Sequence, residues 1–234
     1  MKRPFFPWMF FKAMVRTGIV SLLTLWQGLR GTTTHVRIDR SIAWWAGGLL
    51  RDAHITLDIR GREHLEPYGP MVIMSNHQSL YDIPSILVGL PPSVRMVAKS
   101  ELFRIPIWGR AMAAAGFIEI DRKNRDRARA SLRLARKRLE DGVQVWIAPE
   151  GTRSPDGKLL PFKKGGFVLA AEMEIPILPI TINGTREVLP AHTWSPNAGT
   201  VVRLTIHPRV PQPSSKKRDD WMRSVRERIE SGLS

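Results

Sequence analysis

The sequence predicts an α/β fold: a layered domain with a central, mostly parallel or mixed sheet flanked by helices. From Ile55 onward, short apolar runs typical of buried strands alternate with segments of helical periodicity. Polar clusters follow two of these runs directly, and functional loops stand at such strand ends in layered sheets. The 234 residues, 43% of them hydrophobic, are enough to bury one sizeable core.

The composition limits the chemistry. The chain has no cysteine, which excludes thiol catalysis, cysteine metal sites and disulfides. Lysine and arginine number 36 against 21 acidic residues, and the net charge is +15. Such a surface attracts polyanions, and charge alone leaves anionic lipid, nucleic acid and an acidic carrier protein open.

The first 30 residues combine bulky apolar and basic side chains and contain no acid. Lys12 and Arg16 interrupt the segment and leave only residues 17–26 uncharged, whereas about 20 apolar residues are needed to span a bilayer. No A-x-A-like cleavage site follows. We expect a helix lying in the membrane interface, with Lys12 and Arg16 reaching the headgroups; a true span and burial inside the fold are the alternatives.

A second apolar stretch from Ser41 predicts another helix, so residues 1–54 are expected to form membrane-associating, amphipathic N-terminal helices. The catalytic domain is expected at 55–212 and a C-terminal helix packing on it at 213–234. The strands that the apolar runs predict are 55–61, 71–75, 94–99, 117–120, 143–148, 175–182 and 201–207. The helices that periodicity predicts begin at Asp82 and cover 105–116, 124–142, 166–174 and a last segment with Trp221, Val225 and Ile229 on one face.

The stretch SNHQSLYD follows the apolar run MVIM and contains a candidate base. His77 and Asp82 are five positions apart, so they can pair only if a loop turns into a helix between them. Asp82 is a candidate N-cap, with Pro84 in the first helical turn. An Asp82 carboxylate bonded to one imidazole nitrogen would leave the other free as a general base for a hydroxyl. The alternative is that both residues only cap the helix.

Ser79 in the same stretch is the other candidate for chemistry. It does not lie in a G-x-S-x-G elbow, so a turn role is favoured over a nucleophile. No His and carboxylate spacing typical of a metal site accompanies His77, and no metal is expected.

The second polar cluster, PEGTRS, fits a phosphate monoester. Gly151 lets the backbone turn with exposed amides, while Thr152 and Arg153 offer a hydroxyl and a guanidinium. Glu150 does not suit an anion and is expected to hold a basic residue or a backbone turn. The cations that could add charge are Lys99, Lys163 and Lys164. An ordinary β-turn is the alternative.

Four blocks in order, NHQSLYD, KSELFRIPIWGRAMAAAGFIEIDR, APEGTRS and IPILPITI, resemble the glycerolipid acyltransferase family, in particular the bacterial 1-acyl-sn-glycerol-3-phosphate acyltransferases. The resemblance runs from about Gly61 to Ile182. One departure is Ala148, where relatives often carry phenylalanine.

The resemblance implies a role for each block. It makes His77 the base and Asp82 its partner, and it assigns the acceptor phosphate to Glu150, Gly151, Thr152, Arg153 and Lys99. The second block, thought to help form the acceptor site, lands on Lys99, Glu101, Leu102, Pro106 and Gly109. The fourth, suited to an acyl-chain channel, lands on Ile175, Pro176, Ile177, Leu178 and Pro179.

The implied reaction is acyl transfer from acyl-CoA or acyl-acyl carrier protein to the sn-2 hydroxyl of 1-acyl-glycerol-3-phosphate, giving phosphatidic acid in phospholipid biosynthesis. No cofactor beyond this co-substrate and no nucleic acid partner are expected. The expected partners are the bilayer, lysophosphatidic acid and the acyl donor, at the cytoplasmic face of the inner membrane. The alternatives are another lysolipid acceptor, such as a lysophospholipid or lyso-amino-acid lipid, a serine lipid hydrolase using Ser79, and a non-catalytic basic module.

Overall fold

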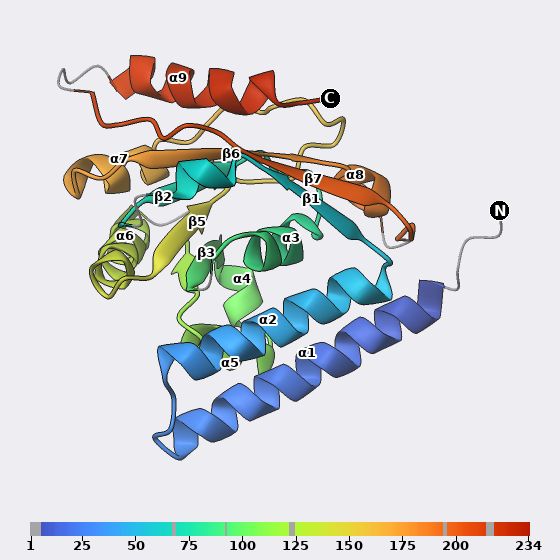
Figure 1. Cartoon of the computed structure of the whole chain (residues 1–234). Helices are drawn as coiled ribbons and strands as arrows, with labels where there is room; N and C mark the ends of the chain where they lie inside the picture. Colours follow the sequence, from blue (N-terminus) through green and yellow to red (C-terminus); the bar gives the residue numbers. More distant parts are fainter. Residues whose placement is uncertain (1–5, 67–68, 92, 122–124, 194–195, 214–217) are drawn as a thin grey trace.

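The computed structural model describes residues 6–66, 69–91, 93–121, 125–193, 196–213 and 218–234, and it has a seven-stranded sheet at its centre (Figure 1). Across the sheet the strands run in the order β1-β7-β6-β2-β5-β3-β4. Their bounds are β1 Thr56–Arg60, β2 Val72–Ser75, β3 Val94–Lys99, β4 Ile118–Ile120, β5 Gln144–Ile147, β6 Ile177–Asn183 and β7 Val201–Ile206. Each lies within or beside a run that the sequence predicts as a strand.

The sheet is mixed, as expected. Strands β6, β2, β5, β3 and β4 are parallel neighbours, β7 runs antiparallel to β6, and β1 is parallel to β7. Because β2, β5 and β3 are parallel, the loops that follow Ser75, Ile147 and Lys99 leave the same edge of the sheet.

Helices cover both faces of the sheet. Their bounds are α1 Phe6–Leu29, α2 His35–Asp52, α3 Asp82–Gly89, α4 Ser100–Phe103, α5 Trp108–Ala114, α6 Arg125–Glu140, α7 Gly165–Glu172, α8 Thr185–Val188 and α9 Arg218–Ser231, with a 3-10 turn at Arg62–Leu65. One core cluster contains residues of α2, α3 and α5, and a second contains residues of α6, α7 and α9. Successive strand side chains alternate between them: Ile177 belongs to the second cluster and Leu178 to the first.

The helix expected over 105–116 begins only at Trp108, because residues 105–107 form a tight turn before it. The short helices α4 and α8 and the 3-10 turn are additions that periodicity over four residues could not predict. In α9 the expected stripe is confirmed, since Trp221, Val225 and Ile229 are all buried. The proposed domain boundaries stay a prediction.

The two expected N-terminal helices form a hairpin, and α1 packs against α2 and α5 (Figure 1). The prediction that Arg16 reaches the headgroups is wrong, because its side chain is only 18% exposed; Lys12 is 40% exposed, and for it the prediction stays open. The Arg16 guanidinium lies 3.1 Å from the Asp52 carboxylate, and the Lys12 ammonium lies 3.6 Å from it. Asp52 is the last residue of α2, and its carboxylate holds Arg16 inside the hairpin. The Trp45 indole also donates to the Thr17 hydroxyl at 3.0 Å.

Helix α1 has the reverse of a water-soluble pattern. Ser21 and Thr24 are among its buried side chains, at 2% and 5% exposure. Its large exposed side chains are apolar: Trp8, Phe10, Phe11, Met14, Val15, Ile19, Leu22, Leu23, Trp26 and Leu29. From Trp8 to Leu29 the helix is also long and apolar enough, by length and composition, to cross a membrane. Helix α1 therefore turns these two hydroxyls toward the protein and a row of large apolar side chains outward.

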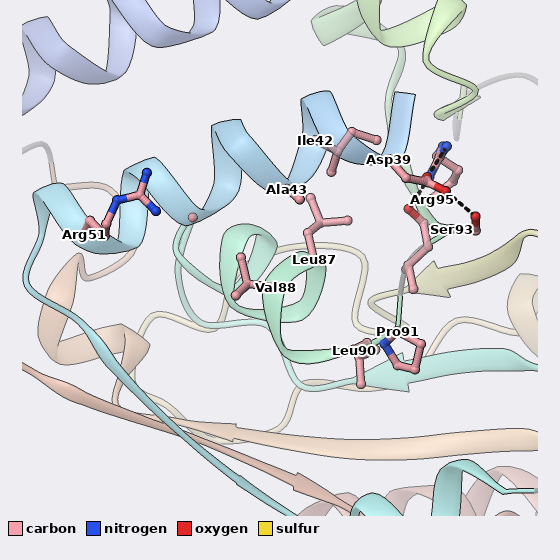
Figure 2. Close-up of a pocket in the computed structure, with 12 residues that line it drawn as sticks. Asp39, Ile42, Ala43, Arg51, Leu87, Val88, Leu90, Pro91, Ser93 and Arg95 are labelled. Carbon is pink, nitrogen blue, oxygen red and sulfur yellow. Dashed lines mark hydrogen bonds and ion pairs between the residues drawn. The ribbon is translucent and has the colours of Figure 1, made fainter. Parts of the chain in front are cut away.

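A buried ion pair joins the hairpin to the sheet (Figure 2). The Arg95 guanidinium of β3 lies 2.7 Å from the Asp39 carboxylate of α2, which also accepts a hydrogen bond from the Ser93 hydroxyl. Arg95 is 2% exposed and donates further to the carbonyls of Val94 and Ala115. The pair lines one end of a hollow of about 330 Å³ between α2 and α3.

Candidate active site

His77 and Asp82 form a pair at the carboxyl end of β2. The imidazole Nδ1 lies 2.7 Å from Asp82 Oδ2, and the Asp82 side chain is fully buried. The same oxygen accepts hydrogen bonds from the amides of Gln78 at 2.7 Å and Ser79 at 2.9 Å. Three donors thus hold one carboxylate oxygen, and the bond through Nδ1 leaves Nε2 as the nitrogen available to take a proton.

Asp82 differs from the expected N-cap. Helix α3 begins at Asp82 itself, Tyr81 is the capping residue, and Pro84 stands in the first turn as expected. The carboxylate turns back to the amides of the preceding loop instead of forward into the helix. The fold therefore uses this carboxylate to close the loop that carries His77.

Glu150 joins the two polar clusters. It is 2% exposed, and its two carboxylate oxygens accept from the backbone amides of His77 at 2.7 Å and Leu160 at 2.8 Å. Burial raises the pKa of Glu150, while hydrogen bonds from the Leu160 and His77 amides oppose the rise. The Ser154 amide completes the link by donating to the His77 carbonyl at 2.7 Å. Of the two expected roles for Glu150, the backbone-turn role is confirmed.

A second set of contacts ties the histidine loop to the neighbouring strands β6 and β5. The Asn76 side chain pairs with the backbone of Ile182 in β6, donating to its carbonyl and accepting from its amide. The Trp146 indole of β5 donates to the Ser75 hydroxyl at 3.0 Å, and its ring meets the His77 ring edge-on at 6.4 Å between centroids. Trp146 could not be identified from the sequence as a site residue, because its contacts depend on the pairing of β2 with β5.

Ser79 is a turn residue, as favoured. Its hydroxyl is fully buried, donates to the Leu189 carbonyl at 2.8 Å and accepts from the Tyr81 amide at 3.1 Å. Both interactions stabilise the loop, so this hydroxyl is not presented to a substrate.

The PEGTRS loop differs from expectation at its glycine. Gly151 adopts φ +76°, the left-handed region that favours glycine, but it is buried and its amide donates to the Ala148 carbonyl at 3.0 Å. Thr152 is exposed and Arg153 is half-buried. Within the described part of the chain, no residue forms a hydrogen bond or ion pair with the Arg153 guanidinium. The Gly151 amide is thus bonded within the loop, whereas the guanidinium of Arg153 is bonded to none of the described residues, and its phosphate role stays a prediction.

The other candidate cations differ in position. Lys99 is exposed at the carboxyl end of β3, on the same sheet edge as His77 and Glu150. The Lys164 ammonium instead lies 3.8 Å from Asp219 of α9, and the Lys163 amide donates to the Pro149 carbonyl. Lys99 thus lies at this edge through the sheet topology, and the backbone of Lys163 lies beside the PEGTRS loop through its bond to Pro149.

Several residues of the fourth and second sequence blocks are buried and contribute to packing. Ile177 and Leu178 are fully buried in the two core clusters, Ile175 and Pro179 are buried and Pro176 is half-buried. Their role in an acyl-chain channel stays a prediction. In the second block, Glu101 and Pro106 are exposed and Leu102 is half-buried. At Gly109 a Cβ atom would lie 2.0 Å from the Phe103 carbonyl oxygen, so only glycine fits.

Comparison with known proteins gives consistent matches. A family model described as Acyltransferase matches residues 56–183. The chain is 38% identical over 151 residues to the chloroplastic 1-acyl-sn-glycerol-3-phosphate acyltransferase BAT2 of Brassica napus, covering 64% of this chain and 44% of that protein. It is 39% identical over 134 residues to 1-acyl-sn-glycerol-3-phosphate acyltransferase alpha of Homo sapiens, covering 57% and 47%. The chain thus spans about half the length of the curated relatives it matches.

A solved structure matches almost the whole chain. The crystal structure of the 1-acyl-sn-glycerophosphate acyltransferase PlsC from Thermotoga maritima superposes with a TM-score of 0.79 at 28% identity, covering 97% of this chain and 93% of that one. The family model covers more than half of the sequence and includes the His77 and Glu150 loops. This protein therefore belongs to the acyltransferase family.

Proposed function

We propose that this protein transfers a fatty acyl group to the sn-2 hydroxyl of 1-acyl-sn-glycerol-3-phosphate and so produces phosphatidic acid. The observation that carries the proposal is the His77–Asp82 pair, 2.7 Å apart, in a loop that Glu150 ties to the loop of Arg153. The names of the relatives and of the matching structure support the choice of acceptor.

The reaction follows from the free imidazole nitrogen. His77 Nε2 removes the proton of the acceptor hydroxyl as its oxygen attacks the thioester carbonyl of the donor. Asp82 stabilises the imidazolium that results. The tetrahedral intermediate then collapses, the carbon–sulfur bond breaks, and the imidazolium returns its proton to the leaving thiolate. The products are an ester and a free thiol, and the enzyme regains neutral His77 without a covalent intermediate or a cofactor.

Arg153 is the group proposed to hold the acceptor's phosphate. A guanidinium offers planar, charge-assisted hydrogen bonds that match phosphate oxygens, and the one in this loop has no protein partner within the described residues. Lys99 at the end of β3 would add charge from the neighbouring side. The donor is proposed to be acyl-CoA or acyl-acyl carrier protein; both are anionic, and both suit a chain of net charge +15.

We place the enzyme on the cytoplasmic face of the inner membrane as a monotopic protein. The support is α1, which buries Ser21 and Thr24 and exposes apolar side chains along its length. A helix tied to α2 through Arg16 and Asp52 and packed on α5 lies along the domain, which favours a position within one leaflet over a crossing. The bilayer would then supply the lysolipid acceptor.

The test is an acyl-transfer assay that crosses lysophosphatidic acid, a lysophospholipid and a lyso-amino-acid lipid with both donor types. We expect the wild-type protein to transfer the acyl group to lysophosphatidic acid. The rate of this transfer should be about 10² to 10⁴ times lower in His77→Ala. His192→Ala, at an exposed histidine, is the matched control and should act like wild type. Full activity of His77→Ala would refute the mechanism, and transfer only to another lysolipid would refute the acceptor.

A further inference from the structure

Three consecutive apolar residues stand exposed between α4 and α5. Ile105 and Ile107 are 40% and 48% exposed, and Pro106 between them is exposed too. Arg104 and Arg110, also exposed, flank the three. A short apolar projection with basic neighbours is typical of a segment that enters a lipid surface while its cations remain among the headgroups.

The turn that displays these side chains is strained and tightly bonded. Ile107 has φ 66° and ψ −61°, and the Trp108 amide donates to the Pro106 carbonyl at 2.7 Å, which defines the rare γ-turn with positive φ. A β-branched residue is disfavoured there, and glycine would be relaxed. The Gly109 amide bonds to the Ile105 carbonyl at 2.8 Å. The backbone therefore holds Ile107 outward at a cost in stability, which calls for a compensating role.

The turn lies in a position that suits a membrane contact. It follows β3 and α4, so it leaves the sheet at the edge where the His77 and Glu150 loops also leave. It leads directly into α5, which packs against α1. The turn is therefore connected through α5 to the hairpin that carries the exposed apolar side of α1.

We propose that the Ile105–Ile107 turn inserts into the lipid bilayer beside α1, as a second membrane contact that holds the active-site edge against the lipid surface. This inference rests on the proposed function, because only a lipid acceptor requires that edge to face a bilayer. The occupant is a membrane rather than a protein because α1, which packs against the next helix, also exposes apolar side chains, and because exposed arginines near the turn match anionic headgroups. The exposed acid nearby is Glu101, the second residue of α4, four positions before Ile105.

The absence of cysteine allows a direct test. Single cysteines replacing Ile107, Leu22 of α1 and Leu134 of α6 are labelled with the fluorophore NBD, and the full chain is mixed with vesicles of phosphatidylethanolamine and phosphatidylglycerol whose acyl chains carry bromine. Leu134 is 37% exposed on a helix that covers the opposite face of the sheet. We expect bromine to quench the probes at positions 107 and 22 and to spare the probe at 134.

Other patterns of quenching distinguish the turn contact from the membrane attachment of α1. Quenching at position 22 alone would overturn the turn contact and leave the membrane attachment of α1 intact. Quenching at neither position would remove the membrane proposal and the turn contact together. Equal quenching at all three positions would mean non-specific adsorption and would also overturn the inference.

A second variant distinguishes an effect on membrane binding from an effect on stability. Ile107→Gly removes the apolar side chain and relaxes the positive φ, so we expect a higher melting temperature together with about three- to tenfold weaker partitioning into the same vesicles without bromine. Leu134→Ala serves as the control that leaves partitioning unchanged. Wild-type partitioning by a stable Ile107→Gly protein would overturn the proposal.

Discussion

The Nδ1 atom of His77 and the Oδ2 atom of Asp82 lie 2.7 Å apart, and the same oxygen also closes the histidine loop through the amides of Gln78 and Ser79. The oxygen Oδ1 is buried and has no hydrogen-bond partner among the residues the structure describes. One carboxylate oxygen therefore fixes the imidazole and the loop at once, and substitutions at Asp82 should affect both catalysis and stability.

Asp82→Asn should lower the rate of acyl transfer by about 10² to 10⁴ and the free energy of unfolding by about 1–3 kcal/mol. Asparagine can still accept one amide, but it no longer stabilises an imidazolium and can reverse the imidazole tautomer. Steady-state kinetics and chemical denaturation measure the two effects. Asp156→Asn, at an exposed aspartate outside the pair, is the control; a fully active Asp82→Asn enzyme would contradict the pairing.

The raised pKa of Glu150 should make the stability of the protein depend on pH. Burial raises its pKa in the folded protein above the ordinary value of 4.5. The folded state thus binds the proton more tightly than the unfolded chain, so this stabilisation is complete below the ordinary pKa and is lost as pH rises through the raised one. Glu150→Gln removes the titration, and the melting temperature of wild type relative to the variant should be highest at acid pH.

Thermal melts of both proteins from pH 4 to pH 8 measure this difference. At every pH, Glu150→Gln should also lose activity, because glutamine cannot accept from both the His77 and Leu160 amides and the two loops separate. Glu187→Gln, at an exposed acid, is the matched control. A wild-type advantage that grows toward pH 8 would show that the direction of the pKa shift is wrong.

The sequence predicted the strand runs and the His77–Asp82 pair because these depend on local pattern and on a short motif. It could not predict that Arg16 turns toward Asp52, since that contact requires two helices to pack. The expected exposed amide of Gly151 is likewise replaced by a bond to Ala148, which the strand geometry before it imposes. For Glu150 the residues left two roles open, and only the distances to two backbone amides decide between them. Local signals thus define elements, while long-range contacts define how polar side chains are used.

Arg153→Ala should raise the KM for lysophosphatidic acid by about 10- to 100-fold with a smaller change in kcat. The guanidinium is proposed to hold the acceptor's phosphate in both ground and transition states, which is the pattern of uniform binding. Arg153→Lys should recover only part of the loss, because an ammonium lacks the planar pair of donors. Transfer to a neutral monoacylglycerol, measured in parallel, should be insensitive to both variants.

Lys158→Ala, at an exposed cation in the same loop, is the control for a general charge effect and should leave the KM close to wild type. An unchanged KM in Arg153→Ala, or an equal loss with the neutral acceptor, would contradict the phosphate role.

The Asp39–Arg95 ion pair should be costly to break from one side. Burial lowers the pKa of Arg95, the Asp39 carboxylate 2.7 Å away opposes this, and the arginine is only 2% exposed. Asp39→Asn leaves that charge uncompensated and should reduce the free energy of unfolding by about 3–5 kcal/mol. Chemical denaturation is the measurement, and Glu140→Gln, which breaks the exposed Arg136–Glu140 pair, should leave the free energy of unfolding nearly unchanged.

The double variant Asp39→Leu with Arg95→Met tests why the single change is costly. If the loss in Asp39→Asn comes from an uncompensated buried charge, removing both charges should recover much of it, since apolar side chains of similar volume pack where the pair lay. If the double variant is instead as unstable as Asp39→Asn alone, removing the second charge recovers nothing, and the loss comes from the broken interaction between the two side chains. The Asp39–Arg95 interaction would then add to the apolar packing of α2 in holding the hairpin on the sheet.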